Sequence, residues 1–323
     1  MPENLTDAHR HFSDTTAAQP LPPDGVAACA LCACFANEWA ELGKLSRASV
    51  KKVFGIHPDT EISRFDDAEA ATEQVFSTYL PELEKYLGDA DALGEIGLDS
   101  RISERVPPEM QKRIFCAQLA LAYKYNLPFV VHCVGEWGAV FDTVSSRERV
   151  IEGFEKSDFD TASPKNRFLL HAASCSAEMT ERFSKIGAYF SFGMRELSTK
   201  RGAECARAAR IDRILVERDG DTADARVLAD TVAALAQVRG ASAEEIADAT
   251  LVSLVNSSAV AQRMAAYYAC REQLTVDVNP AAEHAGHVVS LWNEWDKQQT
   301  LACIASRETK ISGLLKSSTS VLV

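Results

Sequence analysis

The chain has 323 residues, of which 46% are hydrophobic and 25% charged, a balance typical of a globular protein that buries its core without disulfide bonds. No apolar run has the length of a membrane-spanning helix, and the N-terminus lacks the basic residues of a secretion signal, so we expect a cytoplasmic protein with no membrane partner. The net charge of −12 argues against an extensive nucleic-acid-binding surface, although an enzyme that touches a few phosphates through bound metals stays compatible with it.

Short apolar runs alternate with longer amphipathic stretches from the N-terminus to about residue 270. Eight of the runs have the length and the β-branched or aromatic content of buried strands. In chain order they lie at residues 4–9, 26–35, 50–56, 90–98, 128–132, 167–171, 188–192 and 213–217.

Helical patterns fill the segments between these runs, most clearly at residues 107–125, 177–186, 222–238 and 244–268. Strands that alternate with helices predict a parallel sheet, and eight such units at this length predict a closed α/β barrel, the (β/α)8 TIM barrel. We therefore expect one barrel domain over residues 1–268.

The last segment, residues 269–323, lies outside this alternation and is predicted to be a helical extension with a weakly ordered tail. Within it, Leu291, Trp292 and Trp295 follow helical spacing, so one helix should bury an apolar face. That face is expected to pack on the barrel or on a second subunit, which would make the protein an oligomer.

The nine cysteines are scattered rather than arranged as a disulfide framework. Cys29, Cys32 and Cys34 form a C-x-x-C-x-C cluster that could indicate a structural zinc site. No second Cys or His pair follows at the spacing of a zinc finger, so we favour the interpretation that these cysteines are small buried residues of a strand.

Side chains that bind metals gather at the ends of the predicted strands. His9 and His11 are two residues apart, so an extended chain points both to the same side. One carboxylate lies in the fourth strand, histidines end the fifth and sixth strands, and a second carboxylate follows the eighth. Each alone has an ordinary explanation, such as helix capping, but together they predict a metal centre, because strand ends of a barrel share one rim. The predicted ligands are His9, His11, Glu95, His132, His171 and Asp219.

This mixture of imidazole and carboxylate groups suits one or two divalent metal ions, such as zinc, magnesium or manganese. We predict that His9, His11 and Asp219 hold one metal and that the histidines of the fifth and sixth strands hold the other. Glu95 would bridge the two metals, and Asp219 would also act as the general base toward the attacking water. Glu95 and Asp219 are thus the predicted catalytic pair.

Several short motifs occur in a fixed order along residues 1–268: DAHRHF at 7–12, GIHP at 55–58, GEIGLD at 94–99, NLP at 126–128 with VVH at 130–132, His171, ERD at 217–219 and Asn256. In these motifs the chain resembles the TatD family of metal-dependent deoxyribonucleases. The resemblance implies a TIM barrel, a centre of one or two metals, and hydrolysis of a phosphodiester such as a DNA 3′ end.

The chain departs from the family pattern beside the predicted ligands. Ser100 stands where the family commonly has Tyr after GEIGLD, and Val134 where it has Arg two residues after the fifth-strand histidine. Other departures are Asp59 after GIHP, Ala172-Ala173-Ser174-Cys175 after His171, and Gly220-Asp221 after the final Asp. Arg195, Arg201 and Arg218 remain candidates for contact with a substrate anion, and His57 for a role behind the ligands or at the substrate.

Three functions agree with these residues. The first is a TatD-type phosphodiester hydrolase that acts on DNA ends or a small phosphorylated compound. The second is an amidohydrolase-like enzyme that cleaves a C–N or C–O bond with the same metal-activated water. The third is a barrel that binds metal without catalysis and serves as an interaction protein. Basic residues beside the metals would favour phosphate, and a closed neutral pocket an amide or lactone.

Overall fold

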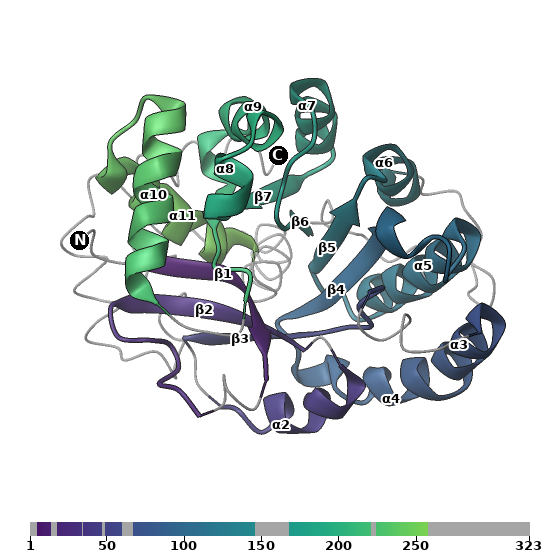
Figure 1. Cartoon of the computed structure of the whole chain (residues 1–323). Coiled ribbons are helices and arrows are strands. Elements are labelled where there is room, and N and C mark those ends of the chain that lie inside the picture. The colour runs from purple at the N-terminus through teal and green to yellow at the C-terminus, as the bar shows by residue number, and fades with distance from the viewer. Residues whose placement is uncertain are drawn as a thin grey trace, which may run out of the picture.

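The computed structural model describes residues 5–13, 18–33, 35–46, 49–59, 67–145, 168–220 and 224–257. Within them, eight parallel strands form one sheet whose spatial order follows the chain from β1 to β8, with helices on its outer side (Figure 1). The predicted α/β barrel is confirmed. The predicted C-terminal extension, residues 269–323, lies outside the described residues, as does Cys34.

All eight predicted strands are present, and their bounds differ from the expected ones by a few residues. The largest difference is in the first strand, which continues to Phe12 because Arg10 and Phe12 still pair with the second strand. The strands are β1 (Leu5–Phe12), β2 (Val26–Ala33), β3 (Val50–Phe54), β4 (Ala92–Asp99), β5 (Phe129–Val134), β6 (Phe168–Leu170), β7 (Ala188–Phe192) and β8 (Ile214–Val216).

The predicted helices are also present, the last of them as far as the structure describes it. The helices are α2 (Trp39–Gly43), α3 (Ala68–Gln74), α4 (Leu80–Glu84), α5 (Pro108–Lys124), α6 (Trp137–Ser145), α7 (Ala177–Lys185), α8 (Met194–Leu197), α9 (Lys200–Ala208), α10 (Ala225–Arg239) and α11 (Ala243–Ser257). Short single-turn helices are η1 (Ala36–Glu38), η3 (Val75–Tyr79), η4 (Leu87–Asp89), η5 (Ser100–Ile102) and η7 (Ile211–Arg213). In the described part of the chain, no helix is long and apolar enough to cross a membrane.

Local sequence explains where several helices begin and end. Ser176 caps α7 by accepting a hydrogen bond from the Met179 N–H, and Asp224 caps α10 in the same way through the Arg226 N–H. Gly240 ends α10 in a left-handed conformation (φ 67°) that a residue without a Cβ adopts at little cost. These signals fix the helix ends that flank the last strands of the barrel.

The ring of strands closes through the segment that follows β8. The Asp219 N–H donates to the carbonyl of His9 (3.2 Å), and the His11 N–H donates to the carbonyl of Gly220 (3.1 Å). These two hydrogen bonds join the first and last units of the barrel at its C-terminal rim. They also place three predicted ligands side by side.

The core has two layers, because parallel strands are buried on both faces. Inside the barrel lie mostly small side chains, whereas larger apolar residues fill the space between the sheet and the helices. Cys32 belongs to the inner layer and Cys29 to the outer one, so the two thiols face opposite sides of β2. This arrangement supports the interpretation of both as small buried residues.

Two glycines of the GEIGLD motif allow β4 to lie very close to β5. A Cβ on Gly94 would come 2.7 Å from the Val130 Cβ, and a Cβ on Gly97 would come 1.9 Å from the His132 carbonyl oxygen. Gly97 also has a φ of 148°, which side chains disfavour. The motif therefore has a packing role that brings Glu95 and His132 together.

We expect Gly97→Ala to lower the free energy of unfolding by about 3 kcal/mol, because the new methyl group collides with backbone rather than with a movable side chain. Gly138→Ala is the matched control, since a Cβ built there meets no atom of the described residues within 4 Å apart from its own stretch of helix backbone. Urea denaturation of the two variants measures the difference. Equal stability of the two variants would contradict the close approach of β4 and β5.

Candidate metal centre

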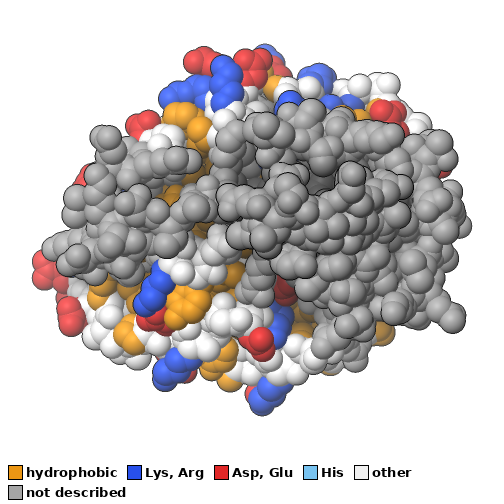
Figure 2. Space-filling model, turned by 180° about the vertical axis from the view of Figure 1, so that it is seen from behind, with side chains coloured by type: hydrophobic (Ala, Val, Ile, Leu, Met, Phe, Trp, Pro, Cys, Tyr) orange, Lys and Arg blue, Asp and Glu red, His pale blue; other side chains and the backbone are white. Residues whose placement is uncertain are grey.

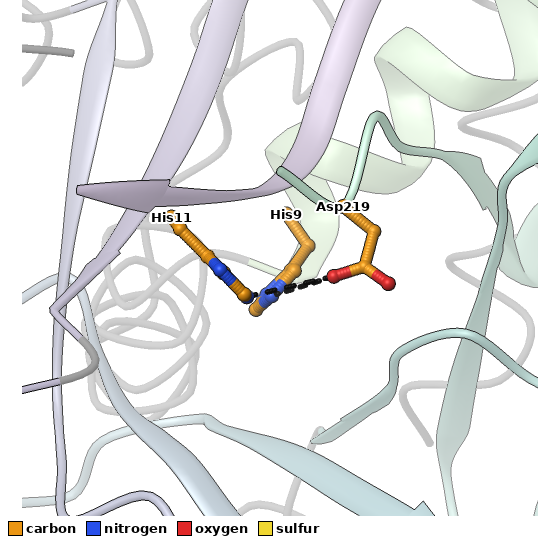
Figure 3. Close-up of side chains that lie close together, drawn as sticks. All are labelled: His9, His11 and Asp219. Carbon is orange, nitrogen blue, oxygen red and sulfur yellow. Dashed lines mark ion pairs between the residues drawn. The ribbon is translucent and has the colours of Figure 1, made fainter. Parts of the chain in front are cut away.

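The six predicted ligands meet at the C-terminal rim of the barrel. His9 and His11 extend from β1 toward Asp219, which follows β8 (Figure 3). The Asp219 Oδ1 atom lies 3.8 Å from His9 Nε2 and 3.5 Å from His11 Nε2. Asp219 has a left-handed backbone (φ 48°), which is uncommon for a residue with a side chain and is held by its hydrogen bond to His9.

Glu95 occupies the middle of the cluster and is fully buried. Its Oε2 atom lies 3.2 Å from His9 Nε2 and 3.7 Å from His11 Nε2. Its Oε1 atom lies 2.9 Å from His132 Nδ1 and also contacts His171 Nε2. The two oxygens of one carboxylate thus separate the two pairs of histidines, which is the arrangement that a bridging ligand needs.

Electrostatics keep the carboxylate of Glu95 ionised. Burial raises the pKa of Glu95, but the positive charge of the surrounding histidines, His171 first, outweighs burial and holds the pKa well below its usual range. Burial also lowers the pKa of His171, but Glu95 and Glu217 reverse this effect and raise it well above the ordinary value. For His11 burial prevails and lowers the pKa to about 4, so this imidazole is uncharged at neutral pH.

The donors fit a divalent metal. His9 Nε2 and Glu95 Oε2 are buried, and neither has a hydrogen-bond partner among the described residues, although polar atoms in a protein core are normally satisfied. Among the described residues, four overlapping groups each bring three donor atoms within 4.8 Å of one another: His9, His11 and Asp219; His9, Glu95 and His171; His57, Glu95 and His132; and His171, Glu217 and Asp219. Imidazole with carboxylate is a donor set suited to zinc, manganese and similar ions. The binding of metal by each residue stays a prediction.

Three further histidine or carboxylate side chains lie in or beside this cluster and were not among the predicted ligands. His57, a candidate for a supporting role, lies 3.3 Å from both Glu95 Oε1 and His132 Nδ1. Asp99, the last residue of GEIGLD, has its Oδ2 atom 3.0 Å from His132 Nε2. Glu217 is fully buried, accepts the Ala172 N–H at 2.7 Å and lies 3.7 Å from His171 Nδ1.

Sequence offers a signal for two of these residues. Asp99 and Glu217 each lie at the end of a strand, like the predicted ligands, and Glu217 precedes Asp219 by two residues. By contrast, the thiol of Cys32, which lies 3.1 Å from His9 Nδ1, comes from a neighbouring strand. Only the register of β1 against β2 brings these two side chains together, and the sequence does not show that register.

The candidate arginines differ in their relation to the site. Arg195 contacts Asp219 directly, with Nη2 3.2 Å from Oδ2, while its Nε donates to Glu196 at 2.7 Å. Arg218 is tied to the barrel by its backbone N–H, which donates to Asp7 Oδ1 at 3.0 Å. Arg101, which was not a candidate, chelates Asp99 and lies 3.5 Å from Asp59. Cations therefore lie next to the carboxylates of the rim.

A family model described as TatD related DNase matches residues 6–256, more than half of the chain. The chain belongs to the TatD family. The match covers every strand from β1 onward except Leu5, and all six predicted ligands. The family resemblance predicted from the short motifs is confirmed.

This TatD-family chain is similar to a curated protein in sequence and to solved structures in fold. The uncharacterized metal-dependent hydrolase YabD of Bacillus subtilis (strain 168) is 28% identical over 130 residues, which are 40% of this chain and 45% of YabD, so the match spans less than half of that relative. The crystal structure of YjjV, a TatD homologue from Escherichia coli K12, superposes with a TM-score of 0.61 at 21% identity, over 80% of this chain and 98% of YjjV. An uncharacterized amidohydrolase from Saccharomyces cerevisiae gives a TM-score of 0.58 at 13% identity, over 79% of this chain and 100% of its own. Both structures show the same fold.

We expect Asp99→Asn to weaken metal binding about 10–100-fold, because the carboxylate at His132 Nε2 orients the ring whose Nδ1 faces Glu95. Asp89→Asn is the control, since Asp89 is exposed and lies 3.6 Å from Lys52. Calorimetric titration of the metal-free proteins with zinc and manganese gives the affinities. An unchanged affinity in Asp99→Asn would show that the contact of Asp99 with His132 does not contribute to metal binding.

Proposed function

We propose that this TatD-family chain is a metal-dependent phosphodiesterase that acts on DNA ends or on a small phosphorylated compound. The observation that carries the proposal is the ion pair between Arg195 and Asp219, one of the predicted metal ligands. This side chain is 72% exposed and yet bonded to Asp219, so a cation at the open side of the donor cluster faces solvent. A guanidinium in this position suits a phosphate oxygen.

The residues have separate parts in the proposed reaction. The histidines, Glu95 and Asp219 would hold a divalent metal, which when bound would supply Lewis acidity toward the phosphoryl group and lower the pKa of water. Burial raises the pKa of Asp219, but the charges of His171 and His9 lower it below the ordinary value, so Asp219 is ionised and accepts a proton from the attacking water. Arg195 orients Asp219 through Oδ2 and presents positive charge to the phosphate.

The net charge and the described side chains on one face suit a small substrate or a chain end better than a long duplex. On the face in Figure 2, the described Lys and Arg side chains lie among Asp and Glu rather than in one continuous basic band. With a net charge of −12, such a surface gives little long-range attraction to DNA. Binding would therefore depend on contacts at the rim.

The test is hydrolysis of bis-p-nitrophenyl phosphate and of single-stranded DNA labelled at its 5′ or 3′ end, by protein loaded with zinc, manganese or magnesium. We expect turnover of the diester and stepwise shortening of the DNA from one end. Bound metal with no hydrolysis of either substrate would overturn the proposal. Amides and lactones then test the amidohydrolase alternative, and inactivity on those as well would favour a non-catalytic metal-binding protein.

Arg195→Ala separates phosphate recognition from the metal-dependent step. We expect kcat/KM for the diester to fall about 10-fold or more, because a charge-assisted hydrogen bond is lost while the histidines remain. Arg210→Ala is the matched control, since Arg210 pairs with Asp212 away from the rim, at η7 before β8. An Arg195→Ala enzyme as efficient as the control would show that this cation does not contact the substrate.

A further inference from the structure

Two buried thiols lie in contact behind the site. Cys175 lies in the loop between β6 and α7, one residue before the cap of α7, and Cys205 lies on α9. Their sulfur atoms are 3.7 Å apart, and their exposed fractions are 1% and 0%. The Thr180 hydroxyl lies 3.3 Å from the sulfur of Cys175 and 3.2 Å from that of Cys205. These cysteines are 30 residues apart, and no sequence pattern pairs them.

The two thiols have different surroundings. Hydrogen bonding from Cys205 lowers the pKa of Cys175, with further help from Thr180 and the charge of Arg201, while burial opposes the shift. The same contact and burial raise the pKa of Cys205. A position at the start of a helix and beside an arginine is typical of reactive cysteines. The pair thus combines a thiol whose pKa is lowered with a second thiol whose sulfur lies in contact with it.

We propose that Cys175 and Cys205 form an oxidisable dithiol that hydrogen peroxide converts to a disulfide. In the first step, the Cys175 thiolate attacks the peroxide O–O bond and becomes a sulfenic acid, with the other oxygen leaving as water after protonation. In the second step, the Cys205 sulfur displaces the hydroxyl group, which leaves as water. Overall, two thiols lose two electrons and two protons, and one peroxide yields two waters.

The bond would connect the rim to the outer helices. A disulfide has an S–S distance of about 2.05 Å, so the sulfurs must approach by more than an ångström. His171 precedes Cys175 by four residues in the same loop, and the Ala173 N–H donates to the Ser191 carbonyl between them. Oxidation would therefore tie the segment that follows His171 to α9.

The test is peptide mapping under non-reducing conditions. Full-length protein is freed of reductant, treated with about one equivalent of hydrogen peroxide, alkylated and digested. We expect a peptide pair linked through Cys175 and Cys205, the loss of two thiols per chain, and reversal by dithiothreitol. Cys116→Ser is the control, because Cys116 is the partly exposed cysteine of α5 and its removal leaves the pair intact.

Cys205→Ser tests the order of the two steps. This variant should form no link and should retain Cys175 as a sulfenic acid that dimedone traps. If it does not fold, as judged by circular dichroism, Cys205→Ala replaces it, and the wild-type map stands by itself. The proposal is overturned if peroxide oxidises other cysteines while this pair stays reduced, if Cys175 links to Cys133 instead, or if the link forms only after denaturation.

Discussion

Glu95→Gln is expected to lose most of the bound metal and to lower kcat/KM at least about 100-fold. The substitution keeps the shape of the side chain but removes the charge at the centre of the cluster. Both oxygens of Glu95 face histidines, at 3.2 Å for His9 Nε2 and 2.9 Å for His132 Nδ1. An amide offers only one oxygen acceptor, so it serves one pair of histidines and turns an N–H donor toward the other.

The measurement is metal content by mass spectrometry together with steady-state hydrolysis of the diester. Glu41→Gln is the matched control, because Glu41 forms an exposed ion pair with Lys44 on the surface. Melting curves in a chelator separate folding from metal binding, since loss of one partner from a buried charge cluster also destabilises the protein. Full metal occupancy and normal rates in Glu95→Gln would exclude Glu95 as a bridging ligand.

The barrel could be predicted because its signals are local. Each strand is a short apolar run, and the helix ends carry recognisable residues such as Ser176 and Gly240. The residues at which strands end are harder to predict from the sequence, as β1 shows. His11 remains in the strand because of its pairing with β2, which depends on residues far along the chain. Strand length is thus set by the neighbouring strand as well as by the run itself.

The residues of the candidate cluster could be named from the sequence, but the contacts between them could not. The predicted ligand set comes from side chains of metal-binding type at the ends of successive strands, and a barrel places these ends on one rim. Asp99 and Glu217 share this feature, but carboxylates after strands also cap helices, so their type alone does not assign them. What decides is contact: Asp99 reaches His132 Nε2, and Glu217 reaches the Ala172 N–H.

The structure shows what surrounds two of the departures from the family pattern, Asp59 and Val134. Asp59 stands where His is common, and Arg101 lies 3.5 Å from its Oδ2 atom while chelating Asp99. Positive charge is therefore present on the loop after β4, although Val134 on β5 offers none. The sequences of the loops after barrel strands vary more readily than those of the strands themselves. Related barrels can therefore carry a basic residue on different loops of the same rim.

Asp219→Asn is expected to lower kcat by about 10²–10⁴-fold, the usual contribution of a positioned general base. The amide keeps an oxygen that can face His9 and His11, as Oδ1 does now at 3.8 and 3.5 Å, so metal content should fall much less than the rate. It has no basic carboxylate oxygen to accept a proton from water. It also loses the charge that holds Arg195 at Oδ2.

The contrast between rate and metal content decides between the two roles of Asp219. Asp212→Asn is the matched control, since Asp212 also forms an ion pair with an arginine, Arg210, but away from the rim. A variant that keeps its metal and loses its rate identifies Asp219 as the base. If metal content and rate fall together, the main role of Asp219 is to bind the metal, because the loss of metal then accounts for the loss of rate. A normal rate with normal metal content would exclude both roles and leave Asp219 as the residue that holds the closing segment of the barrel against His9.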